Sequence, residues 1–186
     1  MSDRVHFRFS LPAAVWLTFF LLWDKSGGAV YSICAAAFHE CGHLLLMWLY
    51  RDRPKKITFG VYGMRIEQRQ CVGTSYAQTF WIAFAGPLSN LLLGTVFLPA
   101  RNTLAAAVNF ALALFNLLPI RPMDGGQMLY ALLCRCHSQT CADRVCKKIA
   151  VCGLIPLTAM GVYALVRGGN YSLFLSSLYV VSLLLP

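Results

Sequence analysis

The most chemically informative residues are His39, Glu40 and His43, which form an H-E-x-x-H motif inside the apolar stretch from Ala29 to Tyr50. In a helix, histidines at positions i and i+4 lie on one face about 6 Å apart along the axis, so both imidazoles can bind one tetrahedral Zn²⁺. Glu40 could then act as general base towards a water activated by the metal and later protonate the leaving amine. The motif therefore predicts one catalytic zinc ion and hydrolysis of a peptide bond.

The H-E-x-x-H motif could also arise by chance or serve a purpose other than hydrolysis. Chance would produce it in roughly three of a thousand sequences with this content of histidine and acidic residues. An ionisable side chain in the middle of a membrane helix costs about 2.5 to 3.5 kcal/mol, so three together need a shared purpose. That purpose could be a hydrogen-bonded structural cluster, or metal binding without hydrolysis, as in a transporter or an inactive protease-like binding module. Glu40 favours hydrolysis, because a site that only binds metal needs no base beside it.

A catalytic zinc normally takes three protein ligands, so a third ligand must come from elsewhere in the chain. Outside the motif, every acidic residue lies in a tail or a polar loop except Asp124. Prolines before Asp124 and paired glycines after it should break a helix and leave backbone groups free. A carboxylate there could turn back towards His39 and His43. The spacing alone equally allows a turn or helix-capping aspartate.

The composition points to a membrane. Of the 186 residues, 58% are hydrophobic and 12% charged, whereas soluble domains have about 25% charged residues. A transmembrane helix needs about 20 mostly apolar residues. The candidate spans are Ser10 to Trp23, Ala29 to Tyr50, Phe80 to Ala100, Leu104 to Leu118, Ile149 to Val166 and Tyr171 to Pro186. We therefore expect an all-α polytopic membrane protein with about six transmembrane helices.

The net charge of +9 does not indicate nucleic-acid binding, because the basic residues lie between the apolar stretches and not on one soluble surface. If the spans alternate in direction, all lysines and arginines except Lys25, Arg101 and Arg167 fall on the side of the two termini. The positive-inside rule then places both termini in the cytoplasm. We expect a multi-pass protein of the cell membrane whose loop cysteines are reduced.

The stretch from Arg51 to Gln78 is the longest polar interruption between the early spans. Within it, Ile57 to Tyr62 and Met64 to Glu67 alternate like short strands around glycine. This pattern predicts a small β-hairpin-like segment at the membrane surface, which could bind a substrate as an added strand. A second polar stretch, Cys134 to Lys148, has too few apolar residues for its own core. We expect one membrane-embedded metalloprotease domain over residues 1–186, with no appended soluble domain.

Three motifs, in this order, resemble those of the site-2 protease family of intramembrane zinc metalloproteases, and especially its compact, sporulation-type bacterial members. They are the H-E-x-x-H motif, A-G-P-L-S-N from Ala85 to Asn90, and N-L-L-P with M-D-G between Asn116 and Gly125. The resemblance implies that Asp124 is the third zinc ligand. It also implies a membrane-anchored protein substrate, cleaved in or next to its transmembrane segment, release of a transcription regulator, and a regulatory membrane protein as partner.

The same resemblance implies that Asn116 binds substrate or stabilises the oxyanion. Removing an amide donor with that role typically costs 10²- to 10³-fold in rate, and an interhelical hydrogen bond is the alternative role for Asn116. Asn90 is expected to be architectural, because an amide can tie neighbouring helices together. A second metal could be chelated by four cysteines and a histidine, although their spacing lacks a standard zinc-knuckle pattern. These residues are Cys134, Cys136, His137, Cys141 and Cys146.

Overall fold

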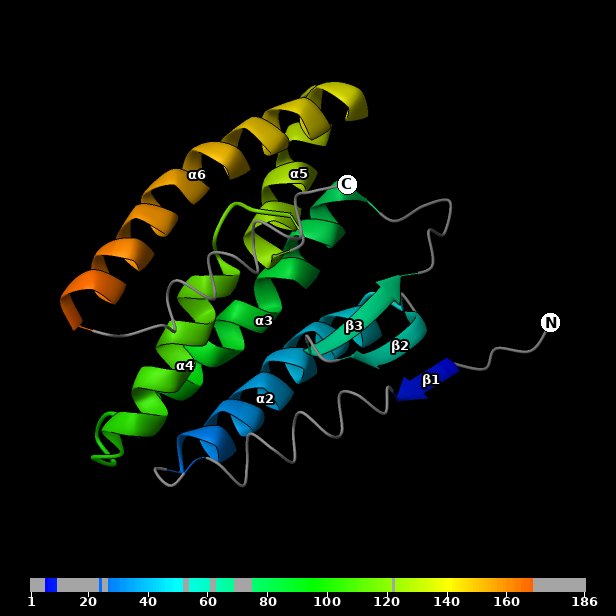
Figure 1. The fold of residues 1–186 in the computed structure, drawn as a ribbon. Helices are drawn as coiled ribbons and strands as arrows, with labels where there is room; N and C mark the ends of the chain where they lie inside the picture. The colour runs from blue at the N-terminus through cyan, green and yellow to red at the C-terminus, as the bar shows by residue number, and fades with distance from the viewer. Residues whose placement is uncertain are drawn as a thin grey trace. The chain divides into compact units, whose positions relative to one another are not determined.

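The structure is a computed structural model of the chain and describes residues 6–9, 24, 27–51, 54–60, 63–68, 75–121 and 123–168. Within these residues it contains helices α2 to α6 and strands β1 to β3 (Figure 1). The contacts divide the chain into two compact units, Met1–Phe115 and Asn116–Pro186. The first unit contains the H-E-x-x-H motif and the second contains Asp124.

The first unit contains two long apolar helices, α2 (Gly28–Leu49) and α3 (Tyr76–Phe97). The Asp24 carboxylate accepts a hydrogen bond of 2.5 Å from a backbone N–H in the first turn of α2. Ser75 begins α3 with a capping box, in which its hydroxyl and the Gln78 side chain each accept from a backbone N–H. Both helices therefore begin where side chains satisfy backbone donors that have no intrahelical partner.

Helices α2 and α3 pack along faces whose buried residues recur at four-residue spacing. On α2 the buried positions at this spacing are Ala35, His39, His43 and Met47. Rows with this spacing can interlock closely when the side chains between them are small. A Cβ atom on Gly42 would lie 2.6 Å from the carbonyl oxygen of Ala85 on α3. Glycine is therefore what lets the two backbones meet at the level of the motif.

Helix α4 (Thr103–Asn116) is held to the other helices of the first unit by polar and close contacts. The Asn102 side chain accepts a hydrogen bond from a backbone N–H of the first turn of α4 and donates one of 2.9 Å to the Tyr31 hydroxyl of α2. A Cβ atom on Gly94 of α3 would lie 2.9 Å from the ring of Phe110 on α4. With 14 residues, α4 is shorter than the length of about 20 residues expected for a full span.

The first unit also contains a three-stranded sheet with the order β1-β2-β3. Strand β2 (Pro54–Gly60) pairs antiparallel with β3 (Gly63–Gln68), in the segment where alternation predicts a hairpin. Strand β1 (His6–Phe9) pairs in parallel with β2 and was not predicted. The fold is therefore mainly helical with a small sheet. A location of this sheet at a membrane surface stays a prediction.

The second unit contains α5 (Asp124–Cys136) and α6 (Gln139–Gly168), which are in contact. The stretch from Cys134 to Lys148, predicted as a polar interruption, is helical except at residues 137 and 138. Helix α6 buries a row of mostly small residues, namely Ala142, Cys146, Ala150 and Leu154. The polar residues of this stretch occupy the exposed face of a helix whose other face is small and apolar.

Arg121 joins parts of the second unit. Its guanidinium lies 4.2 Å from the centre of the Tyr130 ring on α5 and pairs with the Asp143 carboxylate on α6. Because both charged groups are about half exposed, this ion pair should contribute only about 0 to 1 kcal/mol. Burial, followed by a hydrogen bond with Cys134, raises the pKa of Tyr130 to about 12, so its ring stays neutral beneath the cation.

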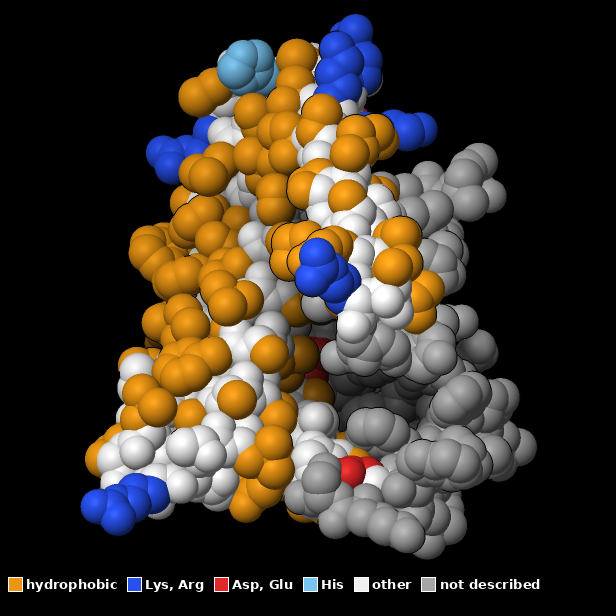
Figure 2. Space-filling model, turned by 60° about the vertical axis from the view of Figure 1, so that its left-hand side comes forward, with side chains coloured by type: hydrophobic (Ala, Val, Ile, Leu, Met, Phe, Trp, Pro, Cys, Tyr) orange, Lys and Arg blue, Asp and Glu red, His pale blue; other side chains and the backbone are white. Residues whose placement is uncertain are grey.

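Within the described residues, three helices, α2, α3 and α6, are long and apolar enough to cross a membrane. Figure 2 shows hydrophobic side chains over most of the described surface in that view. Trp48 of α2 is 77% exposed and Val166 of α6 is 79% exposed. Large exposed apolar surfaces of this kind mark contact with lipid or another protein. The predicted spans Ser10 to Trp23 and Tyr171 to Pro186 lie outside the described residues, so the count of six spans stays a prediction.

Candidate metal centre

The two histidines of the motif lie on the buried face of α2. His39 is 6% exposed and His43 is 8% exposed, and one helical turn separates them. The rings contact each other edge to face, with centroids 4.8 Å apart. Polar atoms buried among apolar helices are costly unless they are paired. The partners of the ring nitrogens therefore decide what the pair can bind.

The Nδ1 atom of His43 lies 2.7 Å from the backbone carbonyl oxygen of Ile82 on α3. A carbonyl oxygen can only accept, so Nδ1 of His43 must carry the hydrogen. In the neutral ring Nε2 then has an unprotonated lone pair, which is the form that ligates a metal ion.

The Nδ1 atom of His39 lies 2.7 Å from the side-chain oxygen of Asn90 on α3. The orientation of the Asn90 amide follows from its other partners. Its nitrogen is 3.0 Å from the backbone carbonyl of Ala35 and 2.9 Å from the side-chain oxygen of Asn109. Because a backbone carbonyl only accepts, the Asn90 nitrogen must face Ala35, and its oxygen must face His39. Nδ1 of His39 therefore also carries the hydrogen.

The chain of amides ends on α4. The Asn109 nitrogen donates to the backbone carbonyl of Ala105 at 2.9 Å, which leaves its oxygen to accept from Asn90. Asn90 is 0% exposed and Asn109 is 2% exposed. The two amides thus satisfy each other while they set the tautomer of His39.

Both Nε2 atoms face each other at a distance of 3.2 Å. In the neutral rings each carries a lone pair, so the two repel unless a proton or a metal ion lies between them. Zn–N bonds of about 2.0 to 2.1 Å at a tetrahedral angle require the two nitrogens to be about 3.3 Å apart. The observed separation of 3.2 Å fits a shared zinc ion.

Gly86 of α3 leaves the space that such an ion needs. A Cβ atom at this position would lie 2.7 Å from Nε2 of His39 and 2.6 Å from Cε1 of His43, and it would also contact Nε2 of His43. A methyl group would therefore stand between the two ligand atoms. This requirement explains a glycine inside an apolar helix, where it costs roughly 1 kcal/mol relative to alanine.

Asp124 is the first residue of α5 in the second unit and is 8% exposed. The N-cap is Met123, so Asp124 is not the capping residue, and its carboxylate lies in the first turn, where the helix dipole favours negative charge. The paired glycines lie inside the helix and do not break it. A Cβ atom on Gly125 would lie 2.6 Å from the Leu118 carbonyl oxygen, so glycine lets the preceding loop fold closely over α5.

Imidazole nitrogens from His39 and His43 and a carboxylate oxygen from Asp124 are a donor set that could hold a metal ion. The described residues contain no second group of this kind, so the cysteines at 134, 136, 141 and 146 do not form one. Glu40 follows His39 on α2 and is half-buried, and Asn116 is the last residue of α4 and is also half-buried.

The sequence did not indicate the role of Asn90 as the partner of His39, nor did it single out Asn109. An asparagine in the middle of an apolar stretch was the available signal, because a buried amide must find partners on other helices. The partners of Asn90 lie 51, 55 and 19 residues away in the chain, so local spacing could not reveal them.

Comparisons with known proteins agree with this chemistry. Residues 100–160 match peptidase family M50. The chain is 31% identical over 164 residues to Rip3 of Mycobacterium tuberculosis. The aligned region covers 77% of this chain and 40% of that protein. It is 28% identical over 123 residues to stage IV sporulation protein FB of Bacillus subtilis, covering 61% of this chain and 43% of that protein. The chain therefore spans about two fifths of the length of these relatives.

The fold is similar to that of the site-2 protease from Methanocaldococcus jannaschii. The TM-score is 0.71 with 20% sequence identity, and the match covers 97% of this chain and 89% of that chain.

Replacing Gly86 with alanine should abolish stoichiometric zinc binding, because the new methyl group would occupy the space between the imidazoles. Zinc per protein after purification, measured by mass spectrometry of the metal, tests this expectation. Gly94→Ala is the matched control, since its Cβ atom would meet the Phe110 ring and not the histidines. Wild-type zinc content in Gly86→Ala would show that the ion is not held between these rings.

Replacing Asn90 with alanine should lower zinc affinity about 10- to 100-fold, because removing the partner that orients a metal ligand has this effect. Competition with a chromophoric chelator measures the affinity. Asn102→Ala is a matched control, since Asn102 bonds to Tyr31 outside the histidine network. Equal affinity in Asn90→Ala and wild type would mean that the amide only ties helices together.

Proposed function

Because the chain belongs to the site-2 protease family, peptidase family M50, we propose that it is a zinc endopeptidase of the membrane. The resemblance of its motifs to this family is thereby confirmed. The substrate we propose is a membrane-anchored protein, cleaved within or next to its transmembrane segment. The observation that carries the proposal is the pair of Nε2 lone pairs held 3.2 Å apart on α2, with a glutamate directly after the first histidine.

We propose that His39, His43 and Asp124 hold one zinc ion. Two neutral imidazoles and one carboxylate are a common donor set for a catalytic zinc that keeps a position open. Zinc bound there would lower the pKa of a water molecule and polarise the carbonyl of the scissile bond. The buried histidines, whose Nδ1 atoms are fixed by neutral acceptors, keep both ligand atoms unprotonated and in place.

Glu40 is the general base in this proposal. It takes a proton from the attacking water and gives it to the leaving amine. Asn116, at the end of α4, donates a hydrogen bond to the oxyanion that develops on the substrate carbonyl. An amide in this role stabilises charge that appears only in the transition state, so its loss should lower kcat more than it raises KM.

The proposed topology has several spans and both termini in the cytoplasm. His39 lies 11 residues before Tyr50, a distance of about 17 Å along the helix. The side that holds most lysines and arginines would be the cytoplasmic side. Water would then reach the zinc from the cytoplasm, and cleavage would release the cytoplasmic part of a substrate, such as a transcription regulator. A regulatory membrane protein could control access to the site.

The sheet suggests where an extended substrate would bind. Residues Ile57, Thr58 and Phe59 of β2 are already paired on both sides, with β1 and with β3. A substrate strand therefore cannot add to β2, whereas β1 and β3 lie at the two edges of the described sheet, and β3 belongs to the predicted hairpin. Edge strands offer unpaired backbone groups to a peptide. We place the substrate on β3.

Coexpression with a panel of tagged single-span membrane proteins tests the proposed activity. Glu40→Gln should reduce cleavage by about 10²- to 10⁴-fold, because it removes the proton acceptor, while zinc content stays at the wild-type level. Asp124→Asn should lose both zinc and cleavage, because it removes a charged ligand. Immunoblots of the tag and metal analysis of the purified variants give the two readouts.

Asp143→Asn is the control for Asp124→Asn, since Asp143 pairs with Arg121 on the exposed surface. Unchanged cleavage in Glu40→Gln would refute the peptidase. Full zinc content in Asp124→Asn would instead show that Asp124 is not a zinc ligand, and it would not contradict the proposed peptidase activity.

Proline substitutions placed one at a time from Met64 to Glu67 test the substrate strand. Along β3, alternate N–H groups point towards β2 or away from it. Proline at positions that point away should stop cleavage with protein level and zinc content unchanged, because it removes a donor offered to the substrate. Alanine at the same positions is the control. If all four proline variants cleave like wild type, the substrate does not pair with β3.

A further inference from the structure

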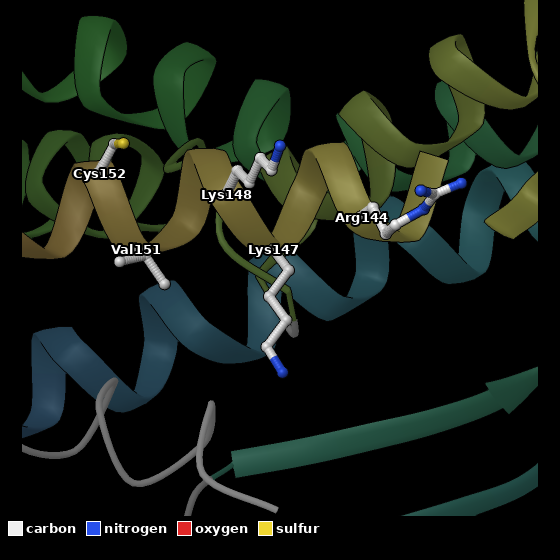
Figure 3. A pocket seen from close by; sticks show the side chains of 5 residues that line it. All are labelled: Arg144, Lys147, Lys148, Val151 and Cys152. Carbon is white, nitrogen blue, oxygen red and sulfur yellow. The ribbon is translucent and has the colours of Figure 1, made fainter. Parts of the chain in front are cut away.

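Helix α6 has two different faces in its first half. One face is the buried row that contains Cys146 and Ala150, both at most 2% exposed. The other face is exposed and lines a groove of about 460 Å³ (Figure 3). We call it the α6 groove. Its described lining residues are Arg144, Lys147, Lys148, Val151 and Cys152.

The α6 groove changes from charged to apolar within one helical turn. Lys147 is followed four residues later by Val151, and Lys148 is followed four residues later by Cys152. Figure 3 shows Lys147 and Val151 on one side of α6 and Lys148 and Cys152 on the other. Each lysine is therefore followed along the helix by an apolar side chain on the same side.

This change coincides with the start of the apolar part of α6. No charged residue occurs between Lys148 and Arg167, and Ile155, one turn beyond Val151, is 65% exposed. Lysines and arginines at the end of a long apolar segment are typical of the level of the lipid headgroups. The α6 groove therefore spans the boundary between headgroups and acyl chains, provided that α6 crosses the membrane.

The positive charge of the α6 groove is not neutralised within the described residues. The second unit has two acidic residues, Asp124 and Asp143, and Asp143 pairs with Arg121. Three cations at positions i, i+3 and i+4 of one helix repel one another. A bound anion would relieve that repulsion, and both guanidinium and ammonium groups bind phosphate well.

We propose that the α6 groove binds an anionic phospholipid, with the phosphate at Arg144, Lys147 and Lys148 and an acyl chain along Val151 and Ile155. A soluble phosphate compound would use the cations but not the apolar continuation. The proposal rests on the membrane location of the chain and not on its peptidase activity. The bound lipid would fix the depth of α6 in the bilayer, because the charged end of the helix cannot move inward without losing its contact with the phosphate.

The test uses the full chain, purified and delipidated in a neutral detergent. Dioleoylphosphatidylglycerol should raise the melting temperature and appear as a bound lipid in native mass spectrometry, whereas dioleoylphosphatidylcholine should do so much less. The variant Arg144→Gln/Lys147→Gln/Lys148→Gln should weaken binding of the anionic lipid at least about tenfold, because three charge contacts are lost. Since these side chains are exposed, the variant should fold.

The control variant, Arg101→Gln/Arg135→Gln/Arg167→Gln, removes the same number of charges at other exposed sites and should bind the lipid like wild type. Equal loss in this control would mean that only the net charge matters and would overturn the site. Equal binding of both lipids, or of inorganic phosphate alone, would also overturn it. Glu40→Gln should keep lipid binding, which separates a failure of this site from a failure of the peptidase.

Discussion

Two imidazole nitrogens, buried and held 3.2 Å apart, are the constraint around which the first unit is organised. In the neutral rings this arrangement brings two lone pairs face to face, where they repel each other. It persists because the Nδ1 atoms of His39 and His43 are both fixed on α3. A metal ion converts the repulsion into two ligand bonds, so binding of the ion and packing of α2 against α3 should support each other.

The partners that fix the histidines are neutral, and this neutrality has consequences for the neighbouring helix. Metal-binding histidines are often oriented by a carboxylate, but a further buried charge would be costly between apolar helices. An amide oxygen can fix the tautomer without a charge. It brings two N–H donors that also need acceptors, and Ala35 and Asn109 provide them. The asparagine on α4 is thus a consequence of the asparagine on α3.

The sequence predicted the parts of the molecule that depend on local spacing. His39 and His43 share a face because helix geometry alone puts residues i and i+4 together. Asn90 was predicted to tie helices, which it does, but its bond to His39 depends on how α3 packs against α2. Strand β1 was missed because its four residues pair with residues 56–59, far along the chain. The polar start of α6 suggested a loop, because average polarity does not reveal which face of a helix each residue occupies.

Glycines have two different effects in the first unit: one stabilises helix packing, and the other favours metal binding at the expense of helix stability. Gly42 lets the backbones of α2 and α3 approach, which stabilises the pair. Gly86 instead keeps the space between two ligand atoms open, because a Cβ atom there would lie close to Nε2 of both His39 and His43. An alanine at position 86 would gain roughly 1 kcal/mol in helix propensity and would remove the site. Glycine at this position therefore favours metal binding over the intrinsic stability of the helix, as expected where function and stability compete.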